Sequence, residues 1–225
     1  MSFIHLNVAS GYSLKYGTTQ PRDLVARAAE FEMPALALTD RDGLAGAIRF
    51  AQSCIEYGIA PIIGINCAID LGDTAKELPR ITLLAHSDGG WRSLCRLLTS
   101  LHMDSDNRKV VLTLELLQKY SQYSTNIYAL HGPQSPLASA IAEHRFDVAF
   151  SIFNKTRDLF ADNAIECVSH LVAGSGPRST AFAARSLIFA RDHDIDAVIT
   201  NAVRMRDAAD GPVADILDCA RQLVP

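Results

Sequence analysis

The segment PALALTDRDGLAGAIRFAQSCIEYGIAPIIGI, residues 34–65, decides the fold class. It begins with a short apolar run over residues 34–40, continues with a helical pattern over residues 44–58, and enters a second apolar run over residues 60–70. Gly58 is suited to end the helix, because glycine readily adopts the left-handed backbone conformation. Two buried strands joined by one helix form a β-α-β unit, in which the strands are parallel.

The same alternation of strand-like and helical segments runs along the rest of the chain. Helices are predicted over residues 20–32, 90–102, 135–144, 146–160, 178–194 and 213–224. Further strands are predicted over residues 2–8, 80–86, 125–131, 163–170 and 196–201. Their near-continuous apolar character indicates burial on both faces. The sequence therefore predicts an α/β protein, a seven-stranded β/α barrel in a single domain, with an open doubly wound sheet as the alternative.

Composition and charge narrow the classes of protein to consider. The chain has 225 residues, of which 48% are hydrophobic, enough for one large domain with a buried core. A net charge of −4 argues against a surface devoted to nucleic-acid phosphates, because that binding needs clustered lysine and arginine. The five cysteines form no CxxC pair, which favours reduced thiols. Without a signal peptide or an apolar run of membrane length, we expect a cytoplasmic protein with no membrane contact.

Polar residues gather at the C-terminal ends of the predicted strands. In a barrel of parallel strands these ends form one face, where β/α enzymes hold their sites. The residues concerned are His5, Asn7, Asp40, Asp42, Asn66, His86, His131, His170 and Asn201. For any one of them, the exposure of strand ends to solvent is the alternative explanation. The pattern places a candidate site without assigning its chemistry.

Four stretches of the chain together resemble a known family. They are FIHLNVASGYSLKYG (3–17), the run 22–65, LLAHSDGGWRSLCRLLT (83–99) and AVITNAVRMRDAADGPVADILDCARQL (197–223). These stretches are similar to the polymerase and histidinol phosphatase (PHP) domain that opens the alpha subunit of bacterial DNA polymerase III, with the error-prone, actinobacterial-like branch most similar. The resemblance implies a distorted seven-stranded barrel whose strand ends hold divalent metal ions for phosphoester hydrolysis.

The residues at the family's metal-ligand positions depart from that pattern. The opening His-x-His falls on His5 and Asn7, so one imidazole is replaced by a neutral amide. Arginine is a fixed cation and cannot ligate a metal ion. The resemblance therefore implies a degenerate metal site with no catalytic residue. Its vestigial positions are His5, Asn7, Tyr16, Arg41, Asn66, Ala202 and Arg204.

Three uses of this altered pocket stay open. Arg41 and Arg204 could fill the former metal space in a structural network, paired with Asp40 or Asp42. The pocket could instead bind a single anion, or it could keep one Zn, Mn or Mg ion, although no cofactor is expected in this domain. The residues of such a residual polar or anion site are His5, Asp40, Arg41, Asp42, His86, His131, His170 and Arg204.

The predicted function follows from the resemblance. We expect residues 1–225 to be the N-terminal PHP domain of a longer DNA-directed DNA polymerase of the DNA polymerase III alpha type, and DILDCARQLVP (215–225) to continue into that longer chain. The domain itself would be catalytically silent, with a structural or interaction role in DNA replication or repair. Its partners would be the remaining polymerase domains or replication subunits, with DNA reached through the parent protein. The alternatives are a stand-alone metal-dependent phosphoesterase or 3′-to-5′ exonuclease with a reduced metal site, and a free-standing interaction module.

Overall fold

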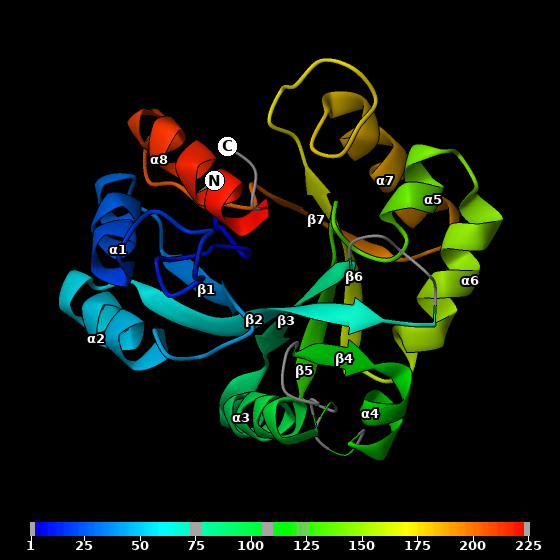
Figure 1. The fold of residues 1–225 in the computed structure, drawn as a ribbon, viewed down its shortest axis with the longest axis horizontal. Coiled ribbons are helices and arrows are strands. Elements are labelled where there is room, and N and C mark those ends of the chain that lie inside the picture. The colour runs from blue at the N-terminus through cyan, green and yellow to red at the C-terminus, as the bar shows by residue number, and fades with distance from the viewer. Residues whose placement is uncertain are drawn as a thin grey trace. The chain divides into compact units, whose positions relative to one another are not determined.

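The computed structural model describes residues 3–72, 78–104, 110–120, 122, 124 and 126–222. The chain divides into two compact units: Met1–Asn66 with Ala202–Pro225, here unit 1, and Cys67–Asn201, here unit 2. Helices alternate with the strands of one mixed seven-stranded sheet, whose order is β1-β2-β3-β5-β6-β7 with β4 beside β2 (Figure 1). The α/β class and the seven-stranded sheet predicted from the sequence are confirmed.

Unit 1 contains the β-α-β segment. Its elements are α1 (Pro21–Glu30), β1 (Ala35–Arg41), α2 (Ala47–Tyr57), the first part of β2 (Ala60–Asp70), η2 (Ala208–Asp210) and α8 (Gly211–Gln222). β1 and β2 are parallel, in a register that runs from Ala35 opposite Ala60 to Arg41 opposite Asn66. Gly58 ends α2 with a φ of 70°, as predicted. The buried side chains between these elements include Val25 of α1, Leu38 of β1 and Phe50 of α2.

The N-terminal segment 3–9 is not a regular strand, although the sequence predicts one over residues 2–8. The carbonyl groups of His5 and Val8 accept hydrogen bonds from Ala37 and Thr39 of β1. On its other side the segment makes a single parallel bridge, between Val8 and Val203. The Val8 N–H donates to the Thr39 hydroxyl at 2.9 Å instead of to a backbone carbonyl, which interrupts the ladder.

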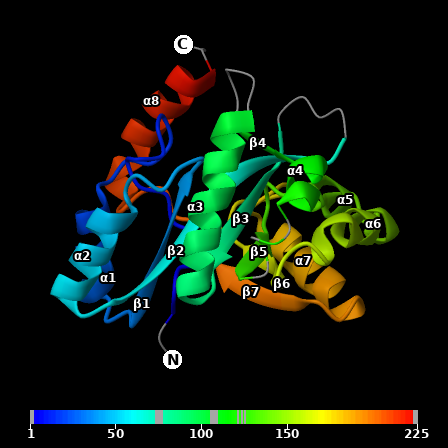
Figure 2. The ribbon, with the colours of Figure 1, turned by 90° about the horizontal axis from the view of Figure 1, so that it is seen from below.

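Unit 2 carries the remaining elements. They are the end of β2, β3 (Arg80–Ala85), α3 (Ser87–Asp104), β4 (Val111–Thr113), α4 (Leu114–Lys119), β5 (Ile127–His131), α5 (Ala138–Ala142), α6 (Phe146–Arg157), β6 (Asp162–Val168), α7 (Thr180–Asp192) and β7 (Asp196–Thr200). The strand pairs β5–β6 and β6–β7 are parallel, and so is the pair β2–β4. Apolar side chains of α5, α6, β6 and α7 form one buried cluster of this unit. Figure 2 shows α3 running beside β3.

Two features of unit 2 differ from the prediction of parallel β-α units. β3 and β5 are antiparallel, with Ala85 opposite Ile127. β4 and α4 were not predicted, because a three-residue strand and a six-residue helix are too short to show a period in the sequence. The sheet has the predicted number of seven strands because β4, which was not predicted, adds one strand, while the N-terminal segment does not form one. No helix in the described ranges is long and apolar enough to cross a bilayer.

Candidate functional site

Three of the aligned ligand positions come together in unit 1. Arg41 is the last residue of β1, Tyr16 lies in the loop that follows the N-terminal segment, and Arg204 lies just before η2 and α8. The guanidinium carbon of Arg41 lies 3.3 Å from the centre of the Tyr16 ring, and that of Arg204 lies 4.5 Å from the same centre. A cation this close to an aromatic face is attracted by the ring quadrupole. We call this arrangement the arginine–tyrosine cluster.

Arg204 is held in the cluster by α8. Its Nη1 donates to an Asp218 carboxylate oxygen at 2.9 Å, and its Nη2 donates to the Ala214 carbonyl at 2.9 Å. The Arg204 side chain is 12% exposed. Burial tends to raise the pKa of the Asp218 carboxyl, but hydrogen bonds from Arg204 and Arg221, which reach different carboxylate oxygens, lower it below its ordinary value. The ion pair of Arg204 is therefore with Asp218, not with Asp40 or Asp42 as the network hypothesis expected.

Asp40 fixes the loop that presents Tyr16. Its carboxylate accepts hydrogen bonds from the Ser10 N–H at 2.7 Å, the Ser10 hydroxyl at 2.9 Å and the Ser13 hydroxyl at 2.6 Å. Ser13 also accepts the Arg41 N–H at 2.9 Å. Burial raises the pKa of the Asp40 carboxyl, and the hydrogen bonds from the two serines oppose that rise. Gly17 lies so close to the Ser10 carbonyl that a Cβ there would collide with it.

The other metal-ligand positions of unit 1 lie outside the arginine–tyrosine cluster, and each is described by its own contacts or backbone conformation. Burial lowers the pKa of the His5 imidazole, whose Nδ1 is buried without a hydrogen-bond partner and whose ring meets Phe3 edge-on. The Asn7 Oδ1 accepts the Thr39 hydroxyl at 3.3 Å. Asn66 lies within β2, and its carbonyl accepts the Asp42 N–H. Ala202 has a φ of 44°, an uncommon value for a residue with a Cβ.

The three histidines of unit 2 do not gather at one edge of its sheet. His131 ends β5 and is 2% exposed, with its ring against Phe153 of α6. His170 follows β6 and is exposed, and its Nε2 donates to the Asn201 carbonyl at 2.7 Å. His86 follows β3, which is antiparallel to β5, so it lies at the opposite edge from His131. The sequence could not distinguish these edges, because an apolar run does not show the direction of its strand.

Sequence reasoning missed the side chains that position the cluster. Asp218 is fourteen residues from its partner Arg204, and no local pattern joins them. Ser10 and Ser13 are ordinary loop residues in the sequence, and only their hydrogen bonds to Asp40 show their role. A serine can be recognised in a sequence when it caps the start of a helix, but neither Ser10 nor Ser13 begins a helix.

The side chains at the seven vestigial metal-ligand positions do not suit a cluster of divalent ions. They supply one imidazole, two amides, one phenol, two guanidinium groups and one methyl group. Divalent ions close together need carboxylates and neutral imidazoles, and a guanidinium repels them. Within the described ranges, no three His, Cys, Asp or Glu side chains lie close enough to hold a metal ion together.

Comparison with known proteins finds one family and several relatives. The PHP domain family matches residues 5–170. The chain is 30% identical over 210 residues to the DNA polymerase III subunit alpha of Caulobacter vibrioides, covering 89% of this chain and 18% of that protein. It is 41% identical over 108 residues to the error-prone DNA polymerase of Symbiobacterium thermophilum, covering 48% of this chain and 9% of that protein. It thus spans less than a fifth of either relative.

A solved structure shows the same fold. A protein of Bifidobacterium adolescentis assigned as a metal-dependent phosphoesterase superposes with a TM-score of 0.53 at 13% identity, covering 90% of this chain and 88% of that one. At this identity the likeness concerns the fold alone. The chain is thus similar both to the PHP regions of DNA polymerase III alpha subunits and, in fold, to PHP-type phosphoesterases.

Proposed function

Since its match extends over well more than half of the sequence, this chain belongs to the PHP domain family, and we propose that it is the N-terminal PHP domain of a DNA polymerase III alpha-type polymerase with a degenerate metal site. The domain itself is catalytically silent and has a structural and interaction role in replication or repair. Nucleotidyl transfer belongs to the rest of the parent protein. The same proposal places the chain in the cytoplasm, beside the other polymerase domains or replication subunits.

The arginine–tyrosine cluster is the observation that carries this proposal. Arg41, Arg204 and Tyr16 are far apart in the sequence, yet the guanidinium carbons of both arginines lie within 4.5 Å of the centre of the Tyr16 ring. Their convergence supports the alignment that assigns all three to the same ligand shell. Two fixed positive charges in that shell favour an internal ion pair and ring stacking over a divalent ion.

The cluster also supports a structural role. Arg204 connects the Tyr16 loop to α8 through its hydrogen bonds to Asp218 and the Ala214 carbonyl. Metal ions that bridge several ligands join separate parts of a chain, and stacked arginines with ion pairs can do the same. Vestigial metal positions of this kind keep unit 1 folded without a metal.

The relatives support the polymerase assignment over the phosphoesterase alternative. The match to the Caulobacter polymerase subunit covers 89% of this chain at 30% identity. The likeness to the Bifidobacterium protein is at 13% identity and concerns the fold. A segment conserved at this level within much longer polymerases fits a domain of such a protein.

The test combines metal analysis with hydrolysis assays on the purified chain. The protein is incubated with Zn²⁺, Mn²⁺ or Mg²⁺, desalted, analysed for bound metal, and assayed on a chromogenic phosphodiester and on 3′-labelled single-stranded DNA. We expect less than about 0.1 equivalent of retained metal and no hydrolysis above the buffer rate. Hydrolysis that disappears in His5→Ala would overturn the silent-domain proposal and favour the phosphoesterase or exonuclease alternative.

A ligand-restored variant provides the matched control. Asn7→His restores the opening His-x-His of the family. The resemblance also implies a histidine of a TDH motif at Arg41, a glutamate after PIIG at Asn66 and a closing Asp-x-His at Ala202 and Arg204, which Arg41→His, Asn66→Glu, Ala202→Asp and Arg204→His restore. We expect this variant to retain more metal than the native chain, because imidazoles and carboxylates replace guanidinium groups and amides. If the restored variant is folded by circular dichroism and retains no more metal than the native chain, the assignment of these positions to one ligand shell is wrong.

A further inference from the structure

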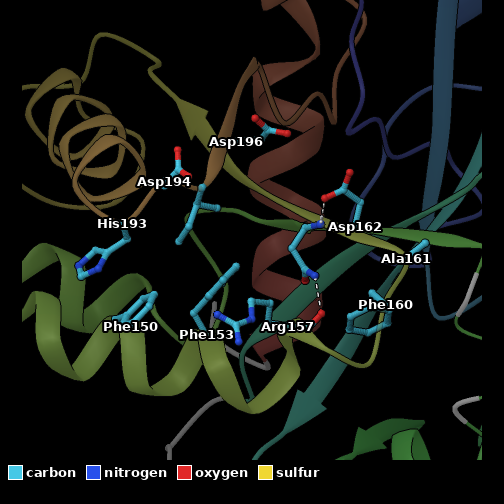
Figure 3. Close-up of a pocket in the computed structure, with 11 residues that line it drawn as sticks. Phe150, Phe153, Arg157, Phe160, Ala161, Asp162, His193, Asp194 and Asp196 are labelled. Atoms are coloured by element: carbon cyan, nitrogen blue, oxygen red, sulfur yellow. Dashed lines mark hydrogen bonds between the residues drawn. The ribbon is translucent and has the colours of Figure 1, made fainter.

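A cavity of about 400 Å³ lies in unit 2, at the N-terminal ends of the parallel strands β6 and β7. Figure 3 shows its walls: α6 on one side, the segment leading into β6 on another, and the turn between α7 and β7 on the third. The cavity lies at the strand ends opposite to those after which His170 and Asn201 follow. Its volume is within the usual range for sites that bind small molecules or side chains.

The floor of the cavity is aromatic and largely buried. Phe153 and Phe160 are 3% and 7% exposed. Phe150 stacks on the His193 ring with 4.3 Å between ring centres and an angle of 14° between the ring planes. The floor is also fixed by hydrogen bonds, because the Asn163 Nδ2 donates to the Arg157 carbonyl at the end of α6 and its Oδ1 pairs with His131. A preorganised aromatic floor suits the flat or aliphatic part of a ligand.

The rim of the cavity is acidic. Asp162, Asp194 and Asp196 line it and are exposed. Asp162 accepts the Asn163 N–H, whereas the carboxylates of Asp194 and Asp196 have neither a hydrogen-bond partner nor an ion-pair partner among the residues that the structure describes. The only rim arginine in the same wall, Arg157, is paired with Asp158 at 3.1 Å. The rim therefore presents uncompensated negative charge above apolar rings.

We propose that this cavity binds the side chain of an arginine on another polypeptide. The aliphatic part of the side chain would lie against the exposed part of the Phe150 ring, with the planar guanidinium at the rim. Its N–H groups would donate to the carboxylates of Asp194 and Asp196. A neutral ligand would use the floor without the rim, and an anion would be repelled by the three carboxylates. This site is independent of the arginine–tyrosine cluster and of the proposed function.

The test uses the intact ¹⁵N-labelled chain and the probe N-acetyl-arginine N-methylamide, which models an arginine within a polypeptide. Titration is followed by two-dimensional ¹H–¹⁵N NMR spectra. We expect saturable shifts of the amide signals of residues 160–163 and 193–196. The citrulline counterpart has nearly the same shape without the charge, and we expect it to bind at least about tenfold more weakly. The lysine counterpart is expected to bind more weakly too, since its ammonium lacks the fork of N–H donors that a guanidinium offers to two carboxylates.

Substitutions of the rim carboxylates test whether the arginine probe binds in this cavity. The double variant Asp194→Asn/Asp196→Asn keeps the side-chain shapes, and asparagine tolerates the φ of 53° found at position 194. We expect it to weaken binding of the arginine probe at least about fivefold. The matched control Asp147→Asn/Asp215→Asn removes the same charge from exposed positions outside the cavity lining and is expected to leave binding unchanged. Circular dichroism confirms that each variant is folded.

The proposal is overturned by any of three results. They are no saturable shift at residues 160–163 and 193–196, equal binding of the arginine and citrulline probes, and unchanged binding in the folded Asp194→Asn/Asp196→Asn variant. Tighter binding of the lysine probe than of the arginine probe would also overturn the choice of a guanidinium. If the double variant is unfolded, the single variants Asp194→Asn and Asp196→Asn are compared in the same way, each against Asp215→Asn.

Discussion

Tyr16 is the residue on which the two arginines of unit 1 converge. Its ring lies 3.3 Å from the guanidinium carbon of Arg41 and 4.5 Å from that of Arg204. Two like charges near one ring repel each other, so the ring quadrupole and the Asp218 carboxylate must offset that repulsion. The aromatic face of position 16 therefore matters more to stability than its hydroxyl group.

A pair of substitutions at Tyr16 tests this point. Tyr16→Leu removes the aromatic face, and we expect it to lower the free energy of unfolding by about 1–2 kcal/mol. Tyr16→Phe keeps the ring and is expected to change it by less than about 0.5 kcal/mol. Urea unfolding followed by circular dichroism measures both. Equal losses in the two variants would show that the phenol hydroxyl, rather than the ring, stabilises the cluster.

Residue-level chemistry could be predicted from the sequence only in part. The positions Tyr16, Arg41 and Arg204 were predicted to share a pocket, and they do share one ring. The sequence does not predict their counter-charge, because Asp218 lies on a helix fourteen residues after Arg204 and no local pattern joins the two. The serine partners of Asp40 were missed for a similar reason, since a hydrogen bond within a loop leaves no periodic pattern.

At the scale of elements, apolar periodicity located the longer helices and strands but gave no strand direction. The helices α1, α2, α6 and α7 lie within a few residues of their predicted bounds. β3 and β5 were predicted as strands, yet their antiparallel pairing could not be predicted, because buried strands have the same apolar pattern in either direction. That reversal is why His86 and His131 lie at opposite edges of the sheet.

One buried arginine of α7 donates hydrogen bonds to two neighbouring segments. Arg185 is 9% exposed, and it donates to the Ala142 carbonyl at 2.8 Å and to the Ser175 carbonyl at 2.6 Å. It thereby joins the end of α5 to the loop that precedes α7. Hydrogen bonds from a charged donor are among the stronger ones, and removing this buried guanidinium would break both of those that join the two segments.

We expect Arg185→Met to lower the free energy of unfolding by about 2–4 kcal/mol, because methionine fills the space without donating a hydrogen bond. Arg191→Met on the same helix is the control, since Arg191 is 74% exposed and pairs with its neighbour Asp192. Its effect should be within about 0.5 kcal/mol. Thermal unfolding of the two variants beside the native chain gives the comparison, and an equally small effect at Arg185 would contradict an anchoring role.

At the scale of the whole molecule, the pH dependence of stability reports on His131. The Asn163 Nδ2 donates to the Arg157 carbonyl, so its Oδ1 accepts from the His131 Nε2–H, while the buried His131 Nδ1 has no hydrogen-bond partner for a second proton. Burial lowers the pKa of His131 to about 4, and the hydrogen bond to Asn163 opposes only part of that shift. In the unfolded chain the same imidazole has its ordinary pKa of about 6.5.

Between pH 6.5 and pH 4 the unfolded chain therefore binds a proton that the folded chain does not. The free energy of unfolding should fall by about 3 kcal/mol across this window because of His131, with full stability retained above pH 6.5. Urea unfolding at pH 7, 6, 5 and 4 measures this change in the native chain and in His131→Gln, which cannot titrate. We expect a shallower fall in His131→Gln, and because His5 and the carboxylates are present in both proteins, their contributions cancel in the difference. We expect this difference because the folded ring packs against Phe153 and its Nδ1 has no hydrogen-bond partner to stabilise a second proton. Parallel curves would contradict the prediction, because they would mean that His131 binds its proton at the same pH in the folded and the unfolded chain.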